Sequence, residues 1–148
     1  MSVKIDRLMA QGVVVAQPDH SVHYVRRQMK TLDIHALPVA DGHGTPVGIV
    51  RSRDLINVAD SDTPVERVME ADPITVDRHT DVSAAAALMR RHRQRQVIVT
   101  DKGKIVGIVS AFDFLELLEG RRFEEKDGAE FRTGIFHIGE LPEPPSGA

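Results

Sequence analysis

Cysteine and tryptophan are absent from the sequence, and tyrosine occurs once, as Tyr24. A chain without cysteine can form no disulfide, no thiolate metal site and no cysteine nucleophile. Aromatic residues make up 4% of the chain and hydrophobic residues 41%, so the interior must be built from Val, Ile, Leu, Met and Ala. This composition is typical of strands and helices packed in layers.

A strong charge of one sign and a long apolar run are also missing. The formal net charge is −3, so no basic excess points to nucleic acid as a partner. No apolar segment follows the N-terminal charges, and no stretch approaches the roughly 18 apolar residues of a membrane span. We therefore expect a cytoplasmic protein that has neither a membrane nor a nucleic acid as its partner.

The chain repeats itself with an offset of 60 residues, which becomes 59 after one extra residue in a turn of the first copy. The matching segments occur in the same order in both copies: 6–9 with 66–69, 47–50 with 106–109, and Asp54 with Asp113. Such an ordered series predicts two structural units. We place the first unit at residues 1–60 and the second at residues 61–121.

Both copies predict the element order β-α-β-β-α. A β-branched segment favours a strand at 13–15 in the first copy and at 74–76 in the second. An amphipathic helix follows in each copy, with Ser21 as the candidate N-cap in the first and Asp81 in the second. Two strands joined by a turn containing Asp and Gly then predict a hairpin, and a second helix closes the unit. The hairpin strands and closing helices are expected at 36–40, 46–51 and 53–58 in the first copy and at 96–100, 105–110 and 111–121 in the second.

The linker at 59–64 is short and polar, so it keeps the two copies in contact. A unit of this size cannot bury its sheet alone, and we expect the copies to pack face to face. Residues 122–148 have no counterpart in the repeat. Their end is rich in Pro, Gly and Glu, which predicts partial disorder, while 131–138 is compatible with a short extended segment.

Leu37-Pro38-Val39, a turn and residues 47–55 resemble the end of a CBS domain, and so do residues 97–99, a turn and residues 106–114. The resemblance extends over roughly residues 3–120. It implies a Bateman module, an α/β (α+β) fold in which two CBS-type units pack with pseudo-two-fold symmetry and helices sandwich small mixed sheets. It also implies two clefts for adenine nucleotides or adenosyl compounds, frequent homodimers, and regulation of a partner without catalysis.

In the second copy, Asp113 is expected in the first turn of a helix. Its carboxylate offers two oxygens to the ribose hydroxyls, and Ser110 adds a hydroxyl three residues earlier. The free N–H groups of a helix start suit phosphate, and Gly107 permits close approach of the ligand. The segments expected to sandwich the base contain Ile74, Gln96 and Val97.

The first copy keeps the carboxylate, as Asp54, but has Arg51 where the family usually has Thr or Ser. Arg53 occupies a place where the family often has a basic residue near phosphates, and Leu37 and Pro38 are the other expected contacts. We therefore predict unequal sites. The second-copy site binds the nucleoside, while the first-copy site either prefers more phosphate charge or is filled by Arg51.

Structural alternatives exist for each of these residues. Asp54 and Asp113 are also placed as helix caps. The basic run at 90–95 suits a helix C-terminus, although it also lies within reach of a polyphosphate tail. Asp19, His20 and His23 form only a weak zinc motif.

No catalytic motif is present in the sequence. We therefore predict that the chain is not an enzyme, has no metal site and requires no cofactor. The leading hypothesis is a regulatory module that senses AMP, ADP, ATP or a related adenosyl ligand, forms a homodimer and modulates an unidentified partner protein. The alternatives are a ligand-independent interaction or dimerisation module and, least favoured, a metal-dependent enzyme.

Overall fold

Each copy of the repeat is built on a three-stranded sheet. The computed structural model describes residues 3–9, 13–119 and 135–137. The first-copy sheet has the order β2-β3-β4, in which Ala36–Ala40 and Pro46–Arg51 come from the first copy and Glu70–Ala71 comes from the start of the second. The second-copy sheet has the order β5-β6-β7, from strands Thr75–Asp77, Gln96–Asp101 and Lys104–Ser110. The predicted hairpins are thus confirmed, and β4 is an additional strand that the sequence did not predict.

The hairpin turns owe their shape to Asp and Gly. Asp41 accepts hydrogen bonds from the backbone N–H groups of Thr45, at 3.0 Å, and His43, at 2.8 Å. These bonds stabilise the carboxylate and lower the pKa of Asp41 below its usual value. Gly44 and Gly103 have positive φ angles of 80° and 79°, a conformation that glycine adopts at low cost.

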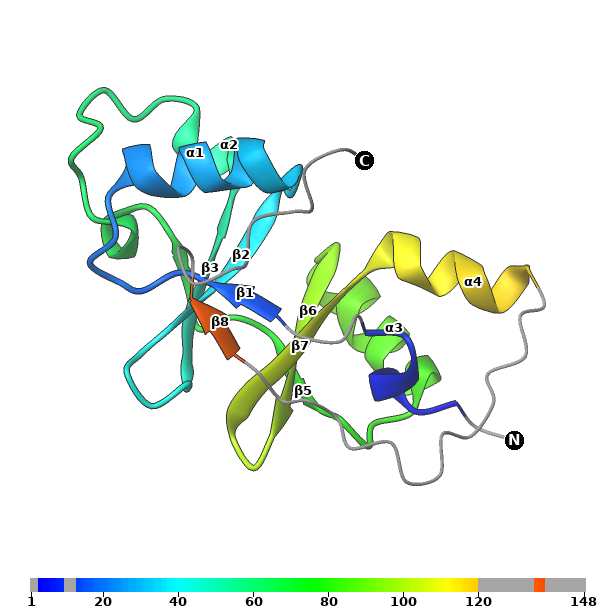
Figure 1. The fold of residues 1–148 in the computed structure, drawn as a ribbon. Helices are drawn as coiled ribbons and strands as arrows, with labels where there is room; N and C mark the ends of the chain where they lie inside the picture. Colours follow the sequence, from blue (N-terminus) through cyan, green and yellow to red (C-terminus); the bar gives the residue numbers. More distant parts are fainter. Residues whose placement is uncertain (1–2, 10–12, 120–134, 138–148) are drawn as a thin grey trace, which may run out of the picture.

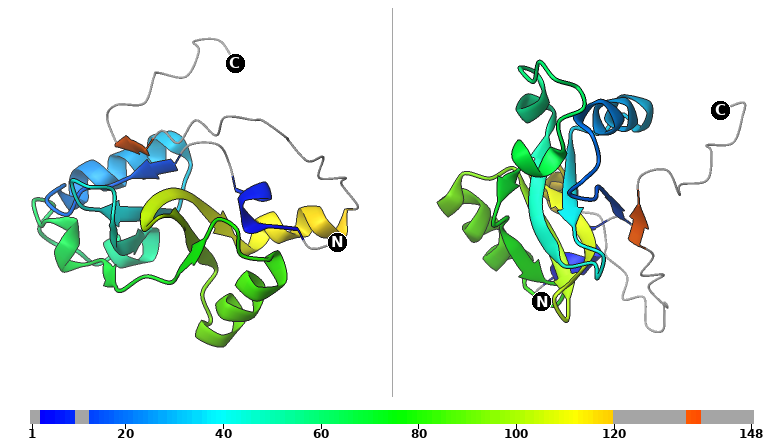
Figure 2. Two further views of the ribbon diagram at one scale, coloured as in Figure 1. Left: turned by 90° about the horizontal axis from the view of Figure 1, so that it is seen from below. Right: turned by 90° about the vertical axis from the view of Figure 1, so that its left-hand side faces the viewer.

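Long helices α1 (Val22–Leu32) and α3 (Val82–His92) lie on the outer sides of the two sheets, as the views in Figures 1 and 2 show. Helix α1 buries Val22, Val25 and Met29, the face predicted from helical spacing. The Ser21 hydroxyl accepts a hydrogen bond from the N–H of Tyr24 at 3.1 Å, which confirms the predicted N-cap. In the described part of the chain, no helix is long and apolar enough to cross a bilayer.

Asp81 is the N-cap residue of α3, as predicted, but its side chain does not accept the expected cap hydrogen bond. The carboxylate pairs instead with Lys4 Nζ at 2.6 Å. Lys4 lies 77 residues away in the sequence, and tertiary packing brings it to the start of α3. A long-range ion pair therefore replaces the local hydrogen bond that the sequence indicated.

The closing helices are shorter than predicted. Helix α2 spans Ser52–Leu55, and the Arg26 guanidinium donates a hydrogen bond to the Leu55 carbonyl, which closes the helix end. In the second copy, a 3₁₀ turn η3 (Ala111–Phe114) precedes α4 (Leu115–Leu118). Residues 120 and 121 of the predicted helix lie outside the described residues.

The turn that opens the first repeat packs into the second copy. This 3₁₀ turn, η1 (Ile5–Arg7), is the dark blue segment beside α3 in Figure 1. Ile5, which has no exposed surface, and Leu8 join the core of the second copy. The Ile5 N–H donates to the Thr80 carbonyl at 2.7 Å, and the Val82 N–H donates to the Val3 carbonyl at 2.8 Å.

The turn that opens the second repeat packs reciprocally into the first copy. In η2 (Val65–Arg67), the fully buried Val65 belongs to the core around α1. Its N–H donates to the His20 carbonyl at 2.9 Å, while the Val22 N–H donates to the Thr63 carbonyl at 2.8 Å. Each copy therefore completes its core with the turn that opens the other copy.

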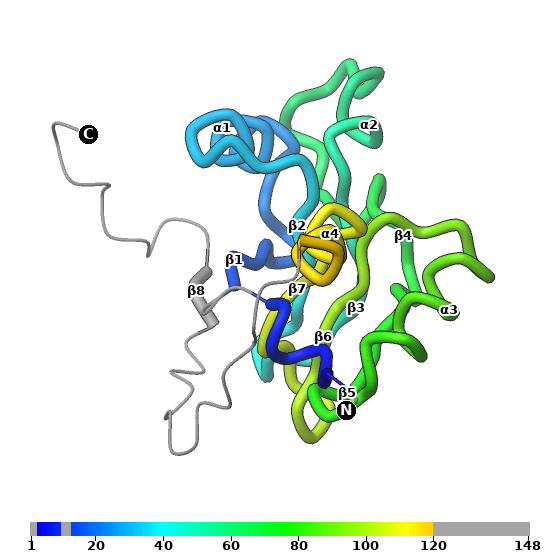
Figure 3. Tube along the Cα trace, turned by 90° about the vertical axis from the view of Figure 1, so that its right-hand side faces the viewer, coloured from blue at the N-terminus to red at the C-terminus, as the bar shows by residue number. Residues whose placement is uncertain are grey.

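A third apolar cluster joins the two sheets. Its buried members come from both copies: Val13, Val15, Ala40, Ile49, Ile98 and Ile105. Strand β1 (Val13–Val15) pairs in parallel with β8 (Ile135–His137), and the next residue, Ala16, bridges Val39. Figure 1 shows β1 and β8 side by side, and Figure 3 shows the strands of the two copies between α1 and α3.

The fold class is confirmed. Two α+β units pack face to face, and helices lie outside small sheets, of which β5-β6-β7 has mixed parallel and antiparallel pairing. The first strand of the second copy is shifted by one residue from the predicted 74–76. In the C-terminal region, β8 falls within the predicted extended segment at 131–138, and the other residues of that region lie outside the described residues.

The exchanged turn leads to a testable prediction about stability. Ile5→Ala should lower the free energy of unfolding by about 2–5 kcal/mol, because it leaves a cavity in the core of the second copy. Ile56→Ala is the matched control, since Ile56 is 73% exposed, and it should change stability by less than about 0.5 kcal/mol. Urea titrations measure both values, and equal small effects would contradict the exchanged packing.

Candidate functional site

Two clefts, related by the repeat, lie where the copies meet, and they differ in size. The larger, here called the Asp113 cleft, has a volume of about 580 Å³. The smaller, here called the Arg51 cleft, has a volume of about 200 Å³. Residues 33–36 line the larger cleft, and their counterparts 93–96 line the smaller one. The sequence repeat therefore gives two corresponding clefts that differ in volume and in the side chains that line them.

Asp113 and Ser110 line the Asp113 cleft together. The Asp113 Oδ2 atom accepts hydrogen bonds from the Ser110 N–H at 2.7 Å and from the Ser110 hydroxyl at 3.1 Å. The predicted capping role of Asp113 is therefore confirmed. Within the described residues Oδ1 makes no hydrogen bond, so the carboxylate keeps one oxygen for a ligand hydroxyl.

The other walls of the Asp113 cleft come from both copies and from the exchanged turn. Ile34, Ala36 and Ile108 provide apolar surface, and Gln96 provides an amide. The remaining lining residues carry ionisable side chains or lie in the exchanged turn and directly after it: Arg7, Leu8, Met9, Asp33, His35 and Glu116. An apolar wall opposite a partly hydrogen-bonded carboxylate suits the base and ribose of a nucleoside.

Several residues that were expected to contact the ligand are buried in the protein and do not line a described cleft. Val97 is fully buried in the second core, and Ile74 is a half-buried residue packed against it. In the first copy, Leu37 is also buried in its core, and Pro38 is buried in β2. Of the residues expected to enclose a base, only Gln96 lines a described cleft.

Gly107 was expected to permit close approach of a ligand, but the atoms that approach it closely belong to Met9. A Cβ atom at this position would collide with Met9, whose Cβ would be 3.1 Å away. Gly48 is covered in the same way by Met69, and a Cβ there would come within 2.9 Å of the Glu70 carbonyl oxygen. The two glycines thus allow the exchanged segments to lie against the hairpins.

Arg51 occupies the smaller cleft. Its side chain, only 9% exposed, donates to Glu70 Oε2 at 2.6 Å and to Gln96 Oε1 at 3.3 Å. It also donates to Gln94 Oε1. The guanidinium therefore extends from the end of β3 to the second copy and fills the space that is open beside its counterpart, Ser110. This arrangement corresponds to the predicted alternative in which Arg51 fills the first-copy site.

Asp54 and Arg53 complete the first-copy sequence motif. Asp54 Oδ2 accepts a hydrogen bond from the Arg51 N–H at 2.8 Å, so it caps α2 as Asp113 caps η3. Arg53 is exposed and lines the Arg51 cleft. The capping arrangement of the two motifs is the same, and the side chains around it make the sites unequal.

Sequence reasoning missed Asp33, Ile34 and Ala36, which help to form one wall of the Asp113 cleft. They follow α1 directly, and Asp33 has a left-handed φ of 52°. The repeat offers a retrospective signal, because a cleft between symmetric copies must take corresponding loops from both. Predicting this wall required knowledge of how the copies face each other.

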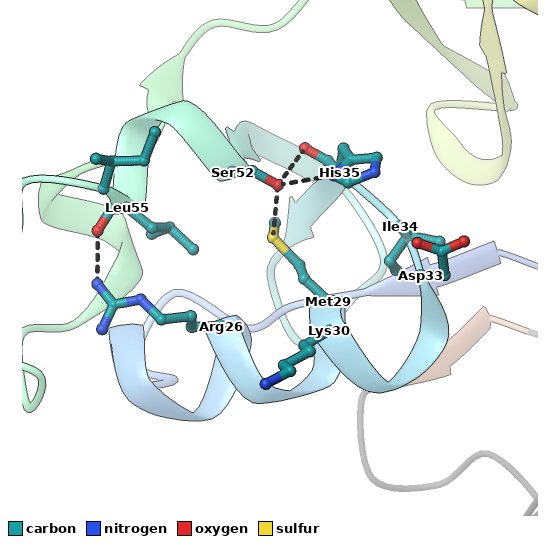
Figure 4. A pocket seen from close by; sticks show the side chains of 9 residues that line it. Arg26, Met29, Lys30, Asp33, Ile34, His35, Ser52 and Leu55 are labelled. Carbon is teal, nitrogen blue, oxygen red and sulfur yellow. Dashed lines mark hydrogen bonds between the residues drawn. The ribbon is translucent and has the colours of Figure 1, made fainter.

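An outer groove of about 420 Å³ lies between α1 and α2, as Figure 4 shows. The Ser52 hydroxyl lies 3.7 Å from Met29 Sδ and 3.3 Å from the carbonyl oxygen and Nδ1 of His35. Arg26 contacts Leu55 at the other end of the groove. Ser52, His35 and Arg26 are therefore engaged with the protein, whereas Asp33, the one carboxylate of the groove's described lining, also lines the Asp113 cleft.

His20, near the start of α1, interacts with neighbouring residues in the sequence. His20 Nδ1 accepts a hydrogen bond from the Gln17 N–H at 3.0 Å, and its ring lies 5.0 Å from that of Tyr24. Across the described ranges, no group of three or more His, Asp or Glu side chains could hold a metal ion.

Comparison with known protein families finds the CBS domain at two places in the chain. A sequence model of the CBS domain matches residues 5–61 and again residues 65–120. A 17.7 kDa protein of Acidianus ambivalens is 31% identical over 122 residues, which cover 80% of this chain and 74% of that protein.

Two similar solved structures contain adenosyl ligands. The CBS domain pair of protein MJ0100, in complex with 5′-methylthioadenosine and S-adenosylmethionine, is 25% identical, with a TM-score of 0.74. The match covers 82% of this chain and all of that one. The CBS domain protein PAE2072 from Pyrobaculum aerophilum, complexed with AMP, is 26% identical, with a TM-score of 0.70. That match covers 79% of this chain and 97% of the other.

The buried guanidinium of Arg51 leads to a second prediction. Glu70→Gln removes the charge that pairs with it and should lower the free energy of unfolding by about 1 kcal/mol, a value reduced because Glu70 is 46% exposed. Glu66→Gln is the control, because Glu66 is exposed and forms no ion pair in the described part of the chain. Chemical denaturation compares the two, and equal stability of both variants would show that the Arg51 ion pair adds nothing.

Proposed function

This chain belongs to the CBS domain family and carries two copies of the domain in tandem, and from this premise we propose that it is a regulatory module that binds one adenosyl ligand in the Asp113 cleft. The observation that carries the proposal is the pair Ser110–Asp113 in a cleft of about 580 Å³. The AMP, S-adenosylmethionine and methylthioadenosine complexes of the similar structures support this class of ligand.

The ribose of the ligand is assigned to Asp113. Ser110 occupies Oδ2 and leaves Oδ1 as an acceptor, and a charged acceptor strengthens a hydrogen bond from a hydroxyl. The base is assigned to the apolar wall formed by Ile34, Ala36 and Ile108, beside the Gln96 amide. This arrangement gives each part of an adenosine group a surface of matching polarity.

Binding in this cleft would couple the two copies. Asp33 and His35 come from the first copy, whereas Ser110 and Asp113 come from the second, so a ligand contacts both. A ligand shifts a conformational equilibrium by the difference between its affinities for the two states. We propose that the packing of the copies changes with occupancy, and that a partner protein or a homodimer responds to this change.

The carboxylate leads to a matched pair of variants. Asp113→Asn should weaken the adenosyl ligand at least about tenfold, because a charge-assisted hydrogen bond is lost. Asp54→Asn loses the equivalent helix cap, at 2.8 Å from the Arg51 N–H, and should change affinity less than about twofold. Calorimetric titration of nucleotide-free protein with AMP, ADP, ATP, S-adenosylmethionine and methylthioadenosine, with GTP as the control, measures both effects.

A uniform failure of all these ligands to bind would favour a ligand-independent interaction module. Equal losses in the two Asp variants would instead contradict the inequality of the clefts.

Arg51 allows a test by gain of function. Arg51→Ser recreates the Ser–x–x–Asp motif of the second copy and should open a second site, which raises the binding stoichiometry from one ligand per chain to two. Arg53→Ser removes an exposed arginine from the same cleft and should leave the stoichiometry at one. Calorimetry reports the stoichiometry directly. An Arg51→Ser variant that folds but still binds a single ligand would show that Arg51 is not what closes the second cleft.

A further inference from the structure

A largely buried ion-pair network holds the opening turn η1 against the second copy. The guanidinium of Arg78 lies 3.3 Å from a carboxylate oxygen of Asp6, in η1, and 3.5 Å from one of Asp101, at the end of β6. The side chain of Arg78 is 14% exposed and that of Asp6 is 8% exposed. The Asp6 N–H also donates a hydrogen bond to the Arg78 carbonyl at 3.3 Å. Charged groups withdrawn from water therefore hold this turn, in addition to the apolar packing of Ile5.

The repeat does not impose this network. Its backbone contact recurs in the first copy, where the Glu66 N–H donates to the Pro18 carbonyl at 3.1 Å. Pro18 has no charged side chain, however, and Glu66 is exposed. Asp41, the counterpart of Asp101, accepts hydrogen bonds from the amides of its own turn. In the part of the chain that the structure describes, ion pairs thus hold η1 but not its counterpart η2.

The network lies directly behind one wall of the Asp113 cleft. Arg7, Leu8 and Met9 line that cleft, and they follow Asp6 without a break in the sequence. Arg78 belongs to the described lining of neither cleft. Because Asp6 is bonded to Arg7, the position of its carboxylate fixes the position of the first residue of this wall.

A buried ion pair defines a position better than it adds stability. The cost of removing two charges from water offsets much of their attraction, and apolar residues of similar volume often serve stability equally well. Breaking the pair is costly all the same, because one charge is left unpaired inside the protein. An apolar contact such as that of Ile5 tolerates a small displacement, whereas a guanidinium and a carboxylate must stay within hydrogen-bonding distance.

From these observations we propose that Arg78 is a positioning residue for the Asp113 cleft. Through Asp6 it holds the segment that carries Arg7, Leu8 and Met9 in the place where this segment contacts an adenosyl ligand. The role in binding rests on the proposed function, but the placement of the segment can be measured without a ligand.

Ligand binding and attachment of the opening turn are then linked. A ligand that contacts the segment at 7–9 stabilises its attachment by the same factor by which attachment strengthens binding. The turn η1 thus becomes the part of the fold that responds to occupancy of the Asp113 cleft.

Hydrogen–deuterium exchange of the full chain without ligand measures the placement directly. Residues 3–9 are the probe and residues 63–69 the internal reference, because Ile5 and Val65 donate equivalent hydrogen bonds, at 2.7 and 2.9 Å. In Arg78→Gln, exchange at 3–9 should become at least about tenfold faster, while exchange at 63–69 should change less than about twofold.

Asp6→Asn breaks the same pair from the other side and should reproduce this result. The double variant should add little to either single one, because both remove the same interaction. Unchanged exchange at 3–9 in both single variants would overturn the proposal, whether or not a ligand is known.

Calorimetric titration with AMP and with S-adenosylmethionine separates positioning from stability. Arg78→Gln should weaken binding at least about fivefold, and Arg78→Lys, which keeps the charge, should fall between it and the unmodified chain. Ile105→Ala is the matched control, because Ile105 is fully buried between the sheets and outside the described lining of both clefts. It lowers stability but should change affinity less than about twofold. Faster exchange with unchanged affinity in Arg78→Gln would reduce the network to a structural role and contradict the proposal.

Two further outcomes keep this proposal distinct from the previous one. Asp113→Asn should weaken the ligand without accelerating exchange at 3–9, whereas either ligand, bound to the unmodified chain, should slow exchange at 3–9 and not at 63–69. Equal slowing of both segments would contradict the linkage. If neither ligand binds the unmodified chain, the proposed function fails, and the exchange at 3–9 alone decides whether Arg78 holds the wall of the cleft.

Discussion

The exchange of the two opening turns is the constraint on which the rest of the structure depends. Ile5 fills the core of the second copy and Val65 that of the first, and both have no exposed surface. Neither copy has a complete core without the turn that opens the other copy. The same exchange builds the site, because η1 continues into Leu8 and Met9, which line the Asp113 cleft. Stability and ligand binding therefore share one segment.

Pseudo-symmetry gives the molecule two equivalent backbones, and a few side chains give the clefts opposite properties. Where the second copy has the small hydroxyl of Ser110, the first copy has the guanidinium of Arg51, which pairs with Glu70 at 2.6 Å. The step from Asp33 to Arg93 changes the sign of a charge at the rim. Duplication followed by divergence at such positions separates an open, partly acidic cleft from a narrow, basic one without altering the fold.

Local sequence features predicted most of the elements, whereas contacts between distant segments did not follow from them. Hairpins and long helices have short-range signals: turn residues such as Gly103, β-branched strands, and the Ser21 cap. Asp81 has the same cap pattern but pairs with Lys4, a partner that only the exchanged turn supplies.

The candidate site shows the same division. Ser110 and Asp113 were predicted because they form a motif within one copy. The wall at 33–36 and the Glu70 partner of Arg51 depend on how the copies meet, which no single-copy pattern contains.

Exchange of the opening turns also affects the order in which the chain can fold during its synthesis on the ribosome. The first copy can close its core once Val65 has emerged, whereas Ile5 must wait for the second copy, whose core includes Val109. At a synthesis rate of about 5–20 residues per second, this N-terminal segment stays unburied for roughly 5–20 s. During that interval its apolar side chains are accessible to chaperones, and to the same segment of neighbouring nascent chains.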